Sequence, residues 1–220
     1  LLTRLLTTID PQTGATLDPE RVYDNTITFL AAGHETTANV LCWTLYLLSE
    51  YPEWDRRVAD EIAREIGDEE PTPAALGRLI LTRQVIDETM RLYPPAPIIP
   101  RIAVEDDQVG PVRVRAGTVV FTAPFVSHRH RSHWKDPDAF DPTRFDPDKR
   151  DTIDRHVYFP FGAGPRICIG AQFAIQEVLV ALAVLLKRWR FVATAPEKVF
   201  PQATITLRPA DRLPMRAERR

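Results

Sequence analysis

The chain has 220 residues, of which 44% are hydrophobic and 26% charged, a composition typical of soluble globular proteins. Lysine and arginine number 28 against 30 aspartate and glutamate residues, and no long basic block favours nucleic acid binding. No segment is apolar for long enough to cross a membrane, and no signal peptide is visible. The two cysteines form no Cys-x-x-Cys pair, which favours a reducing, cytoplasmic location. The first residue is Leu1 rather than Met, so the question of a preceding anchor is left open.

The longest predicted helix runs from about residue 18 to residue 50. Asp18 is suited to the N-cap and Pro19 to the first helical position. Beyond Asn25 the helix is apolar on nearly every face, which predicts burial all round by partners that this chain only partly supplies. Shorter helices are expected over 52–66, after 72–73 and over 81–92.

The pattern then changes to short strands and loops. Strands are predicted at 98–104, 112–115, 118–121 and 204–207. Residues 134–161 are rich in Pro, Asp and aromatic residues, which indicates an ordered loop. A second almost wholly apolar helix is predicted over 170–189. The fold class is therefore mainly α with a small β-sheet, an α+β layout.

A tight loop from Phe159 to Gly170 carries one of the two cysteines. Cys168 stands where this loop meets a predicted helix, and the unpaired N–H groups of a helix N-terminus favour negative charge there. A lone cysteine is more often a buried structural residue, and this is our interpretation of Cys42 within the long apolar helix. For Cys168, the shaped loop around it favours a role as a ligand over that of a buried structural residue.

The cysteine loop resembles the haem-binding signature of the cytochrome P450 family, the haem-thiolate monooxygenases, in Phe161, Gly162, Gly164, Arg166, Cys168 and Gly170. The resemblance implies the C-terminal portion of the P450 fold. It also implies haem b (iron protoporphyrin IX) as cofactor, with Cys168 as the axial ligand of the iron. Phe161 would pack near the sulfur, Gly162 and Gly164 would contact the cofactor, and Arg166 would pair with a haem propionate.

The segment Ala-Gly-His-Glu-Thr-Thr, residues 32–37, lies midway along the long helix. Glycine and threonine are poor residues for a helix interior, and in isolation they indicate a tolerated defect. The segment resembles the family's oxygen-activation motif. That resemblance implies that Glu35 and Thr36 relay protons to dioxygen in a widened helix turn that water enters, and that Ala32 lies against the haem.

A third match begins with Glu88 and Arg91, followed by Leu-Tyr-Pro-Pro. The resemblance implies a buried charge triad of Glu88, Arg91 and Arg144 that holds the cysteine loop in shape, a structural role. Spacing alone is weak evidence, because Glu and Arg three residues apart are common on helix surfaces. Other pairs with this spacing, interpreted as solvated faces, are Glu53–Arg56 and Glu61–Arg64.

A fourth match covers residues 94–101. Arg101 resembles a second partner of the haem propionates. Ala96, Ile98 and Ile99 are expected to face the substrate pocket, although for the two isoleucines the core of a strand is an equal alternative.

Taken together, the resemblance covers residues 1–220, as the C-terminal part of one haem-binding monooxygenase domain whose N-terminal part is absent from the chain. It implies insertion of one atom of dioxygen into a small apolar substrate, such as a fatty acid or terpenoid. The Ala-Gly-His-Glu-Thr-Thr motif most resembles that of soluble bacterial members related to fatty-acid hydroxylases. A Gly-rich dinucleotide fingerprint is absent, so electrons are expected from a separate ferredoxin or flavin reductase. The alternatives are a peroxide-using or rearranging haem-thiolate enzyme, a haem-binding sensor, and a truncated non-functional fragment.

Overall fold

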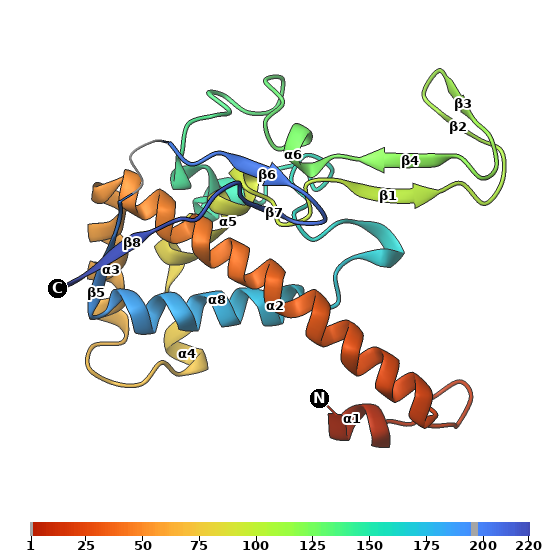
Figure 1. Cartoon of the computed structure of the whole chain (residues 1–220), viewed down its shortest axis with the longest axis horizontal. Helices are drawn as coiled ribbons and strands as arrows, with labels where there is room; N and C mark the ends of the chain where they lie inside the picture. The colour runs from red at the N-terminus through yellow and green to blue at the C-terminus, as the bar shows by residue number, and fades with distance from the viewer. Residues whose placement is uncertain (1, 195–197) are drawn as a thin grey trace.

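The computed structural model describes residues 2–194 and 198–220, in which long helices surround a core and short strands pair in twos (Figure 1). The helices are α1 (Leu2–Thr7), α2 (Pro19–Glu50), α3 (Pro52–Glu65), α4 (Pro73–Leu76), α5 (Ile80–Leu92), α6 (Pro124–Ser127), α7 (Pro147–Arg150) and α8 (Ala171–Leu186), with 3-10 turns η1 (Pro142–Phe145) and η2 (Gly164–Arg166). The strands are β1 (Ile99–Ile102), β2 (Asp107–Val109), β3 (Val112–Val114), β4 (Val119–Thr122), β5 (Trp189–Ala193), β6 (Pro201–Ala203), β7 (Leu207–Pro209) and β8 (Met215–Arg219).

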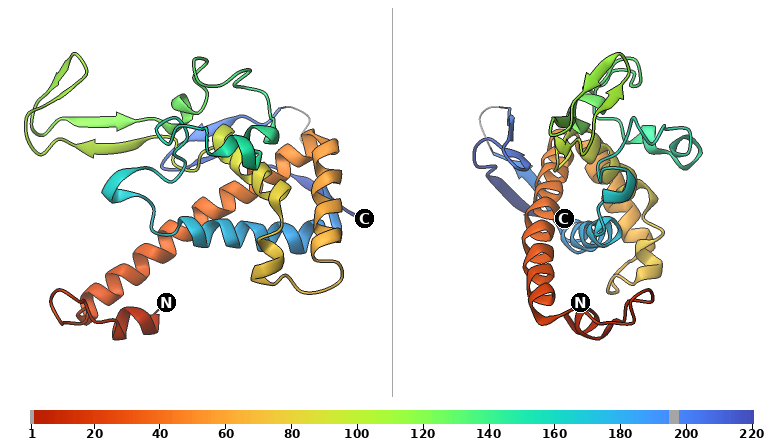
Figure 2. Two further views of the ribbon diagram at one scale, coloured as in Figure 1. Left: turned by 180° about the vertical axis from the view of Figure 1, so that it is seen from behind. Right: turned by 90° about the vertical axis from the view of Figure 1, so that its right-hand side faces the viewer.

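Helix α2 crosses the molecule diagonally, and α5 and α8 pack against it (Figures 1 and 2). Its predicted start is confirmed, because the Asp18 side chain accepts a hydrogen bond from Arg21 N at 2.8 Å and Pro19 follows at the first helical position. The main core joins α2, α3, α5 and α8, with Leu47, Ile86 and Leu182 among its buried residues. These four helices form the frame on which the loops and strands sit.

The two apolar helices are covered on one side only by the described residues. The N-terminal half of α2 projects away from the core (Figure 1), and Tyr23 and Leu30 on it are 66% and 68% exposed. On α8, Phe173 is 70% and Val184 48% exposed. The predicted burial all round is therefore not reached among the described residues. Across residues 2–194 and 198–220, none of the helices combines the length and apolar character needed to span a bilayer.

The predicted strand at 204–207 is wrong. Strands β6 and β7 form a hairpin, and residues 204–206 are its turn, in which Thr204 N donates to Thr206 O at 3.0 Å. The side chains of this turn still alternate between solvent and core: Ile205 is 92% exposed, whereas Thr206 is only 6% exposed.

The second apolar helix is shorter than predicted. It ends at Leu186, and Trp189 begins strand β5, which pairs antiparallel with β8. Neither β5 nor β8 was predicted, because their pairing joins residues that lie far apart in the sequence. The strand β2, which begins at Asp107, was also missed.

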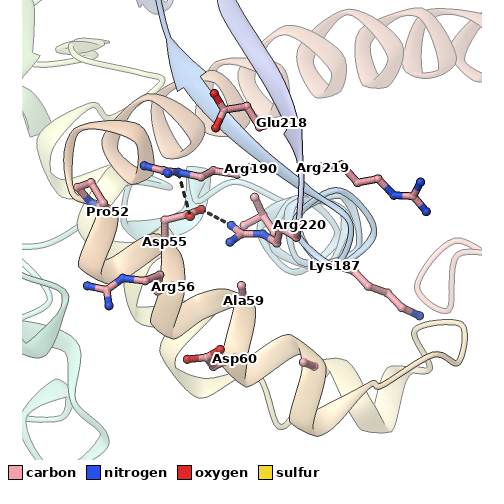
Figure 3. Close-up of a pocket in the computed structure, with 12 residues that line it drawn as sticks. Pro52, Asp55, Arg56, Ala59, Asp60, Lys187, Arg190, Glu218, Arg219 and Arg220 are labelled. Carbon is pink, nitrogen blue, oxygen red and sulfur yellow. Dashed lines mark hydrogen bonds and ion pairs between the residues drawn. The ribbon is translucent and has the colours of Figure 1, made fainter.

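The end of the chain is fastened to helix α3. Arg220 Nη2 donates to Asp55 Oδ1 at 2.5 Å, and Arg190 Nε lies 3.8 Å from Asp55 Oδ2, at the edge of an open pocket of about 560 Å³ (Figure 3). Figure 3 shows Lys187 and Arg219 pointing away from Asp55. The buried Asp55 carboxylate therefore ties the β5–β8 pair to α3.

Candidate functional site

The cysteine loop is closed by its own backbone. Phe159 O accepts a hydrogen bond from Gly162 N, and Phe161 O accepts one from Cys168 N, both at 2.9 Å. Gly162 and Gly164 have φ angles of 75° and 73°, in the left-handed region that residues with a Cβ rarely adopt. The two glycines thus let the chain fold back on itself and present Cys168.

Cys168 lies at the molecular surface, two residues before Gly170, which caps the N-terminus of α8. Apolar residues close to it in the sequence are also exposed: Ile167 is 57%, Ile169 85% and Phe173 70% exposed. Several exposed apolar residues within one short segment are typical of a surface that another group covers.

Two arginines predicted to hold the haem propionates form no ion pair within the described part of the chain. Arg166 is exposed, and Arg101 donates only to the backbone O of Pro100, at 2.8 Å. A cysteine that can supply a thiolate, exposed apolar residues near it in the sequence, and two guanidinium groups with no carboxylate partner among the described residues fit a haem with its propionates.

The motif at residues 32–37 does not open α2. Thr36 Oγ1 donates to Ala32 O and Thr37 Oγ1 donates to Gly33 O, each at 2.8 Å, and α2 is one continuous α-helix through this segment. The predicted widened turn is therefore wrong. The two hydroxyls bond the carbonyls one turn back while the helix stays intact.

Glu35 is held by a residue from the far end of the chain. Thr206 Oγ1, in the β6–β7 turn, donates to Glu35 Oε1 at 2.6 Å, and Asn39 Nδ2 donates to Thr206 Oγ1 at 3.1 Å. Thr206 and Asn39 are buried, whereas Glu35 is exposed. Sequence reasoning missed Thr206 and Asn39, because residues 204–207 resembled a strand and nothing marked Asn39.

The structure brings Glu88, Arg91 and Arg144 together. The Glu88 and Arg91 side chains are completely buried, and Arg91 Nε and Nη2 donate to the two Glu88 oxygens at 2.6 and 2.8 Å. Arg144 Nε lies 3.4 Å from Glu88 Oε1. Burial raises the pKa of Glu88, and the hydrogen bonds from Arg91 and the N–H of Asp141 oppose that rise. Arg91 is thus the principal partner and Arg144 the outer one.

Arg91 also fastens two loop segments to helix α5. Its Nη1 donates to His128 O at 2.8 Å and to Pro137 O at 2.7 Å, and its Nη2 donates to Ala139 O at 3.0 Å. The guanidinium lies 5.1 Å from the centre of the Trp134 ring. One buried side chain therefore fixes the loops that lead toward the cysteine loop.

Glu61 does not lie on a solvated face, so that prediction is wrong. It is 4% exposed and accepts hydrogen bonds from Leu81 N at 2.7 Å, Thr82 N at 2.8 Å and Thr82 Oγ1 at 2.7 Å. These N–H groups belong to the first turn of α5, where no intrahelical acceptor exists. Glu61 therefore caps α5 from α3, whereas Glu53 is exposed as predicted.

Cys42 is exposed, so its interpretation as a buried structural cysteine is wrong. The neighbouring Trp43 is completely buried, and consecutive residues of α2 point in different directions. The face that carries Cys42 is one that the described core does not cover. The helix around it still removes part of its water, because desolvation raises the pKa of the Cys42 thiol.

His128 was missed by sequence reasoning, because it stands in the polar run Ser-His-Arg-His-Arg that resembles a surface loop. It is completely buried, and its Nε2 accepts a hydrogen bond from Phe159 N at 3.0 Å. Burial lowers the pKa of His128 from 6.5 to about 3, the charge of Arg91 adds to this, and the backbone of Met90 opposes it. The folded protein therefore holds His128 neutral.

This shift predicts loss of stability in mild acid. Above pH 6.5 the contribution of His128 is complete; as the pH falls toward 3, the unfolded chain binds a proton that the folded one does not. We expect this group to lower the free energy of unfolding by about 1.4 kcal/mol per pH unit in that window. Urea unfolding at several pH values checks this, with His128→Gln as the control that lacks the slope. Equal slopes in both proteins would contradict the assignment.

The residues predicted to line the substrate pocket are not equivalent. Ile98 is 50% exposed, Ala96 is half-buried, and Ile99 lies against the cysteine loop. A Cβ placed on Gly162 would be 3.6 Å from Ile99 Cδ1. Ile98 and Ala96 are thus available to a ligand, whereas Ile99 supports the loop.

The family model described as Cytochrome P450 matches residues 1–213. The chain belongs to the cytochrome P450 family. Its resemblance, first seen in four short motifs, thus extends along nearly the whole chain.

Several curated members of the cytochrome P450 family are similar. Pentalenene oxygenase of Streptomyces avermitilis is 37% identical over 216 residues, which are 98% of this chain and 48% of that protein. Cyclooctat-9-en-7-ol 5-monooxygenase of Streptomyces melanosporofaciens is 38% identical over 86% of this chain and 41% of its own length. A bifunctional cytochrome P450/NADPH–P450 reductase of Bacillus cereus is 34% identical over 96% of this chain and 20% of its own.

The fold is that of solved P450 haem domains. The crystal structure of the cytochrome P450DA heme domain superimposes with a TM-score of 0.92 at 33% identity, over 98% of this chain and 48% of that one. The mainly helical fold class with small sheets is confirmed. The chain spans about half the length of this structure and less than half of the curated relatives it matches.

Proposed function

We propose that the protein acts as a haem-thiolate monooxygenase in which Cys168 is the axial ligand of haem b. The observation that supports this most directly is the cysteine loop: two glycines with positive φ shape it, and Cys168 is exposed between two exposed isoleucines, Ile167 and Ile169. When bound, haem would supply the activation of dioxygen, and a thiolate ligand favours O–O cleavage. Arg166 and Arg101 would hold the propionates.

The chain's own residues would bind substrate and deliver protons. Ala96 and Ile98 offer apolar surface to a small apolar substrate, such as a terpenoid or fatty acid. Thr36 and Glu35 would pass protons toward dioxygen, with Thr206 holding one Glu35 oxygen at 2.6 Å. The overall change consumes the substrate, dioxygen, two electrons and two protons, and yields the hydroxylated product and water.

The electrons would come from a ferredoxin or a flavin reductase. The relative from Bacillus cereus is named as a bifunctional protein with an NADPH–P450 reductase, which supports a reductase as partner. The oxygenases among the relatives support an organic substrate. A peroxide-using enzyme is the second candidate, and it does not need the acid and alcohol pair that Glu35 and Thr36 supply.

Thr36→Ala tests the proton relay in the intact, haem-loaded protein. Loss of the hydroxyl is expected to lower the product formed per electron pair by about tenfold or more, because a positioned proton donor contributes at least that much. Product and hydrogen peroxide are measured together as electrons are consumed.

Thr37→Ala is the matched control. The Thr37 hydroxyl donates to Gly33 O, one helical turn back, as the Thr36 hydroxyl does to Ala32 O. Thr37 is nevertheless buried, with only 4% of its surface exposed. Its coupling of electrons to product should remain near that of the wild type. If Thr36→Ala also forms as much product per electron pair as the wild type, the relay does not run through Thr36. Peroxide-driven turnover then becomes the better hypothesis.

A further inference from the structure

A buried ring nitrogen links the Glu88–Arg91 pair to the cysteine loop. His128 directly follows α6, and it contacts both the Glu88–Arg91 pair and the cysteine loop. Its backbone O accepts from Arg91 Nη1 at 2.8 Å, while its ring Nε2 accepts from Phe159 N at 3.0 Å. The same residue therefore receives one hydrogen bond from the helix side and one from the loop side.

The connection continues to Cys168 without a break. Phe159 O accepts from Gly162 N, and Phe161 O accepts from Cys168 N. Within residues 2–194 and 198–220, Phe159 N makes no backbone hydrogen bond, so the His128 ring is its acceptor. Phe159 is half-buried, and an N–H with little access to water that loses its acceptor is costly, so this contact restrains where the loop begins.

The ring can accept this bond in one protonation state only. Phe159 N is a donor, so Nε2 must be unprotonated and Nδ1 carries the proton. Nδ1 has no hydrogen-bond partner among the described residues. The ring is thus oriented by Phe159 N and by the packed rings of Tyr158 and Phe159, whose centres lie 5.1 and 5.4 Å away.

We propose that His128 is a positioning residue that sets the start of the cysteine loop through Phe159 N, and so keeps Cys168 in place as a thiolate ligand. This rests on the proposed role of Cys168. His128 does not touch the ligand itself. It acts through its hydrogen bond from Phe159 N, and Phe159 O in turn accepts the loop hydrogen bond from Gly162 N.

The test compares His128→Gln and His128→Leu in the intact, haem-loaded protein. The Gln side-chain oxygen can replace Nε2 as acceptor, whereas Leu offers none. The first readout is the rate at which the reduced, carbon-monoxide-bound protein loses its thiolate-type absorption band in dilute urea. We expect His128→Leu to lose it about tenfold faster than the wild type, and His128→Gln to stay within about threefold.

A matched control separates positioning from general weakening. Trp43 is also completely buried, and its ring Nε1 donates to Leu207 O at 3.1 Å, so Trp43→Phe removes one buried hydrogen bond elsewhere. Trp43→Phe should lower the free energy of unfolding. At urea concentrations below its unfolding midpoint, however, it should lose the thiolate-type band no faster than the wild type. Equal rates for Trp43→Phe and His128→Leu, or failure of Gln to restore the rate, would overturn the proposal.

The second readout is hydrogen exchange at the amides of Phe159 and Gly162, which does not depend on the spectrum. His128→Leu should speed exchange at both, about tenfold at Phe159, and His128→Gln should restore it. Unchanged exchange in His128→Leu would overturn the proposal. A wild type without any thiolate-type band would instead refute the proposed function, and the exchange rates would still decide whether His128 holds the loop.

Discussion

Cys168→Ser is expected to abolish the thiolate-type absorption of the reduced, carbon-monoxide-bound protein. Serine keeps the size of the side chain, and its hydroxyl is not a soft thiolate donor to iron. The loop should survive, because its closing hydrogen bonds, from Gly162 N and Cys168 N, use backbone atoms alone. Absorption spectra of the intact protein loaded with haem measure the change, and circular dichroism checks that the fold is kept.

Cys42→Ser is the matched control, since these are the two cysteines of the chain. Cys42 lies on the surface of α2, and desolvation raises the pKa of its thiol, which disfavours the thiolate. Its spectrum should equal that of the wild type. If Cys168→Ser retained a thiolate-type band, or if Cys42→Ser lost it, Cys168 would not be the ligand.

Arg91→Met is expected to lower the free energy of unfolding by about 3–5 kcal/mol, because it leaves the Glu88 carboxylate buried without its principal partner. It also removes donors from three backbone carbonyls in the loops at residues 128–139. This is a large part of the stability of an ordinary domain, so partial unfolding is expected under mild conditions. Urea unfolding measures the loss, and Arg91→Lys should recover only part of it, because lysine cannot make the two-pronged contact.

Arg78→Met is the surface counterpart. Arg78 Nε lies 2.8 Å from Glu65 Oε2, but the Arg78 side chain is 55% exposed. Water solvates both charges when the pair is broken, so little measurable loss is expected. Losses of similar size in Arg91→Met and Arg78→Met would show that burial does not set the importance of the Glu88–Arg91 pair.

Features with short-range causes could be predicted from the sequence. The start of α2 follows from Asp18 and Pro19, which act within one helical turn. The shape of the cysteine loop follows from its glycines, which permit positive φ wherever they occur. The grouping of Glu88, Arg91 and Arg144 was predicted through a resemblance, since spacing alone did not separate Glu88 from Glu61.

Only the tertiary structure decided which polar residues find distant partners. Glu61 looked like a surface residue and caps α5, Thr206 looked like a strand residue and holds Glu35, and His128 looked like a loop residue and accepts from Phe159. Each contact joins atoms far apart in sequence, and local preference carries no information about them. The sequence by itself therefore determined where the long helix α2 begins and how the loop around Cys168 is shaped. Packing determined which buried hydrogen bonds hold that loop, because such a bond exists only once both partners have been brought together out of water.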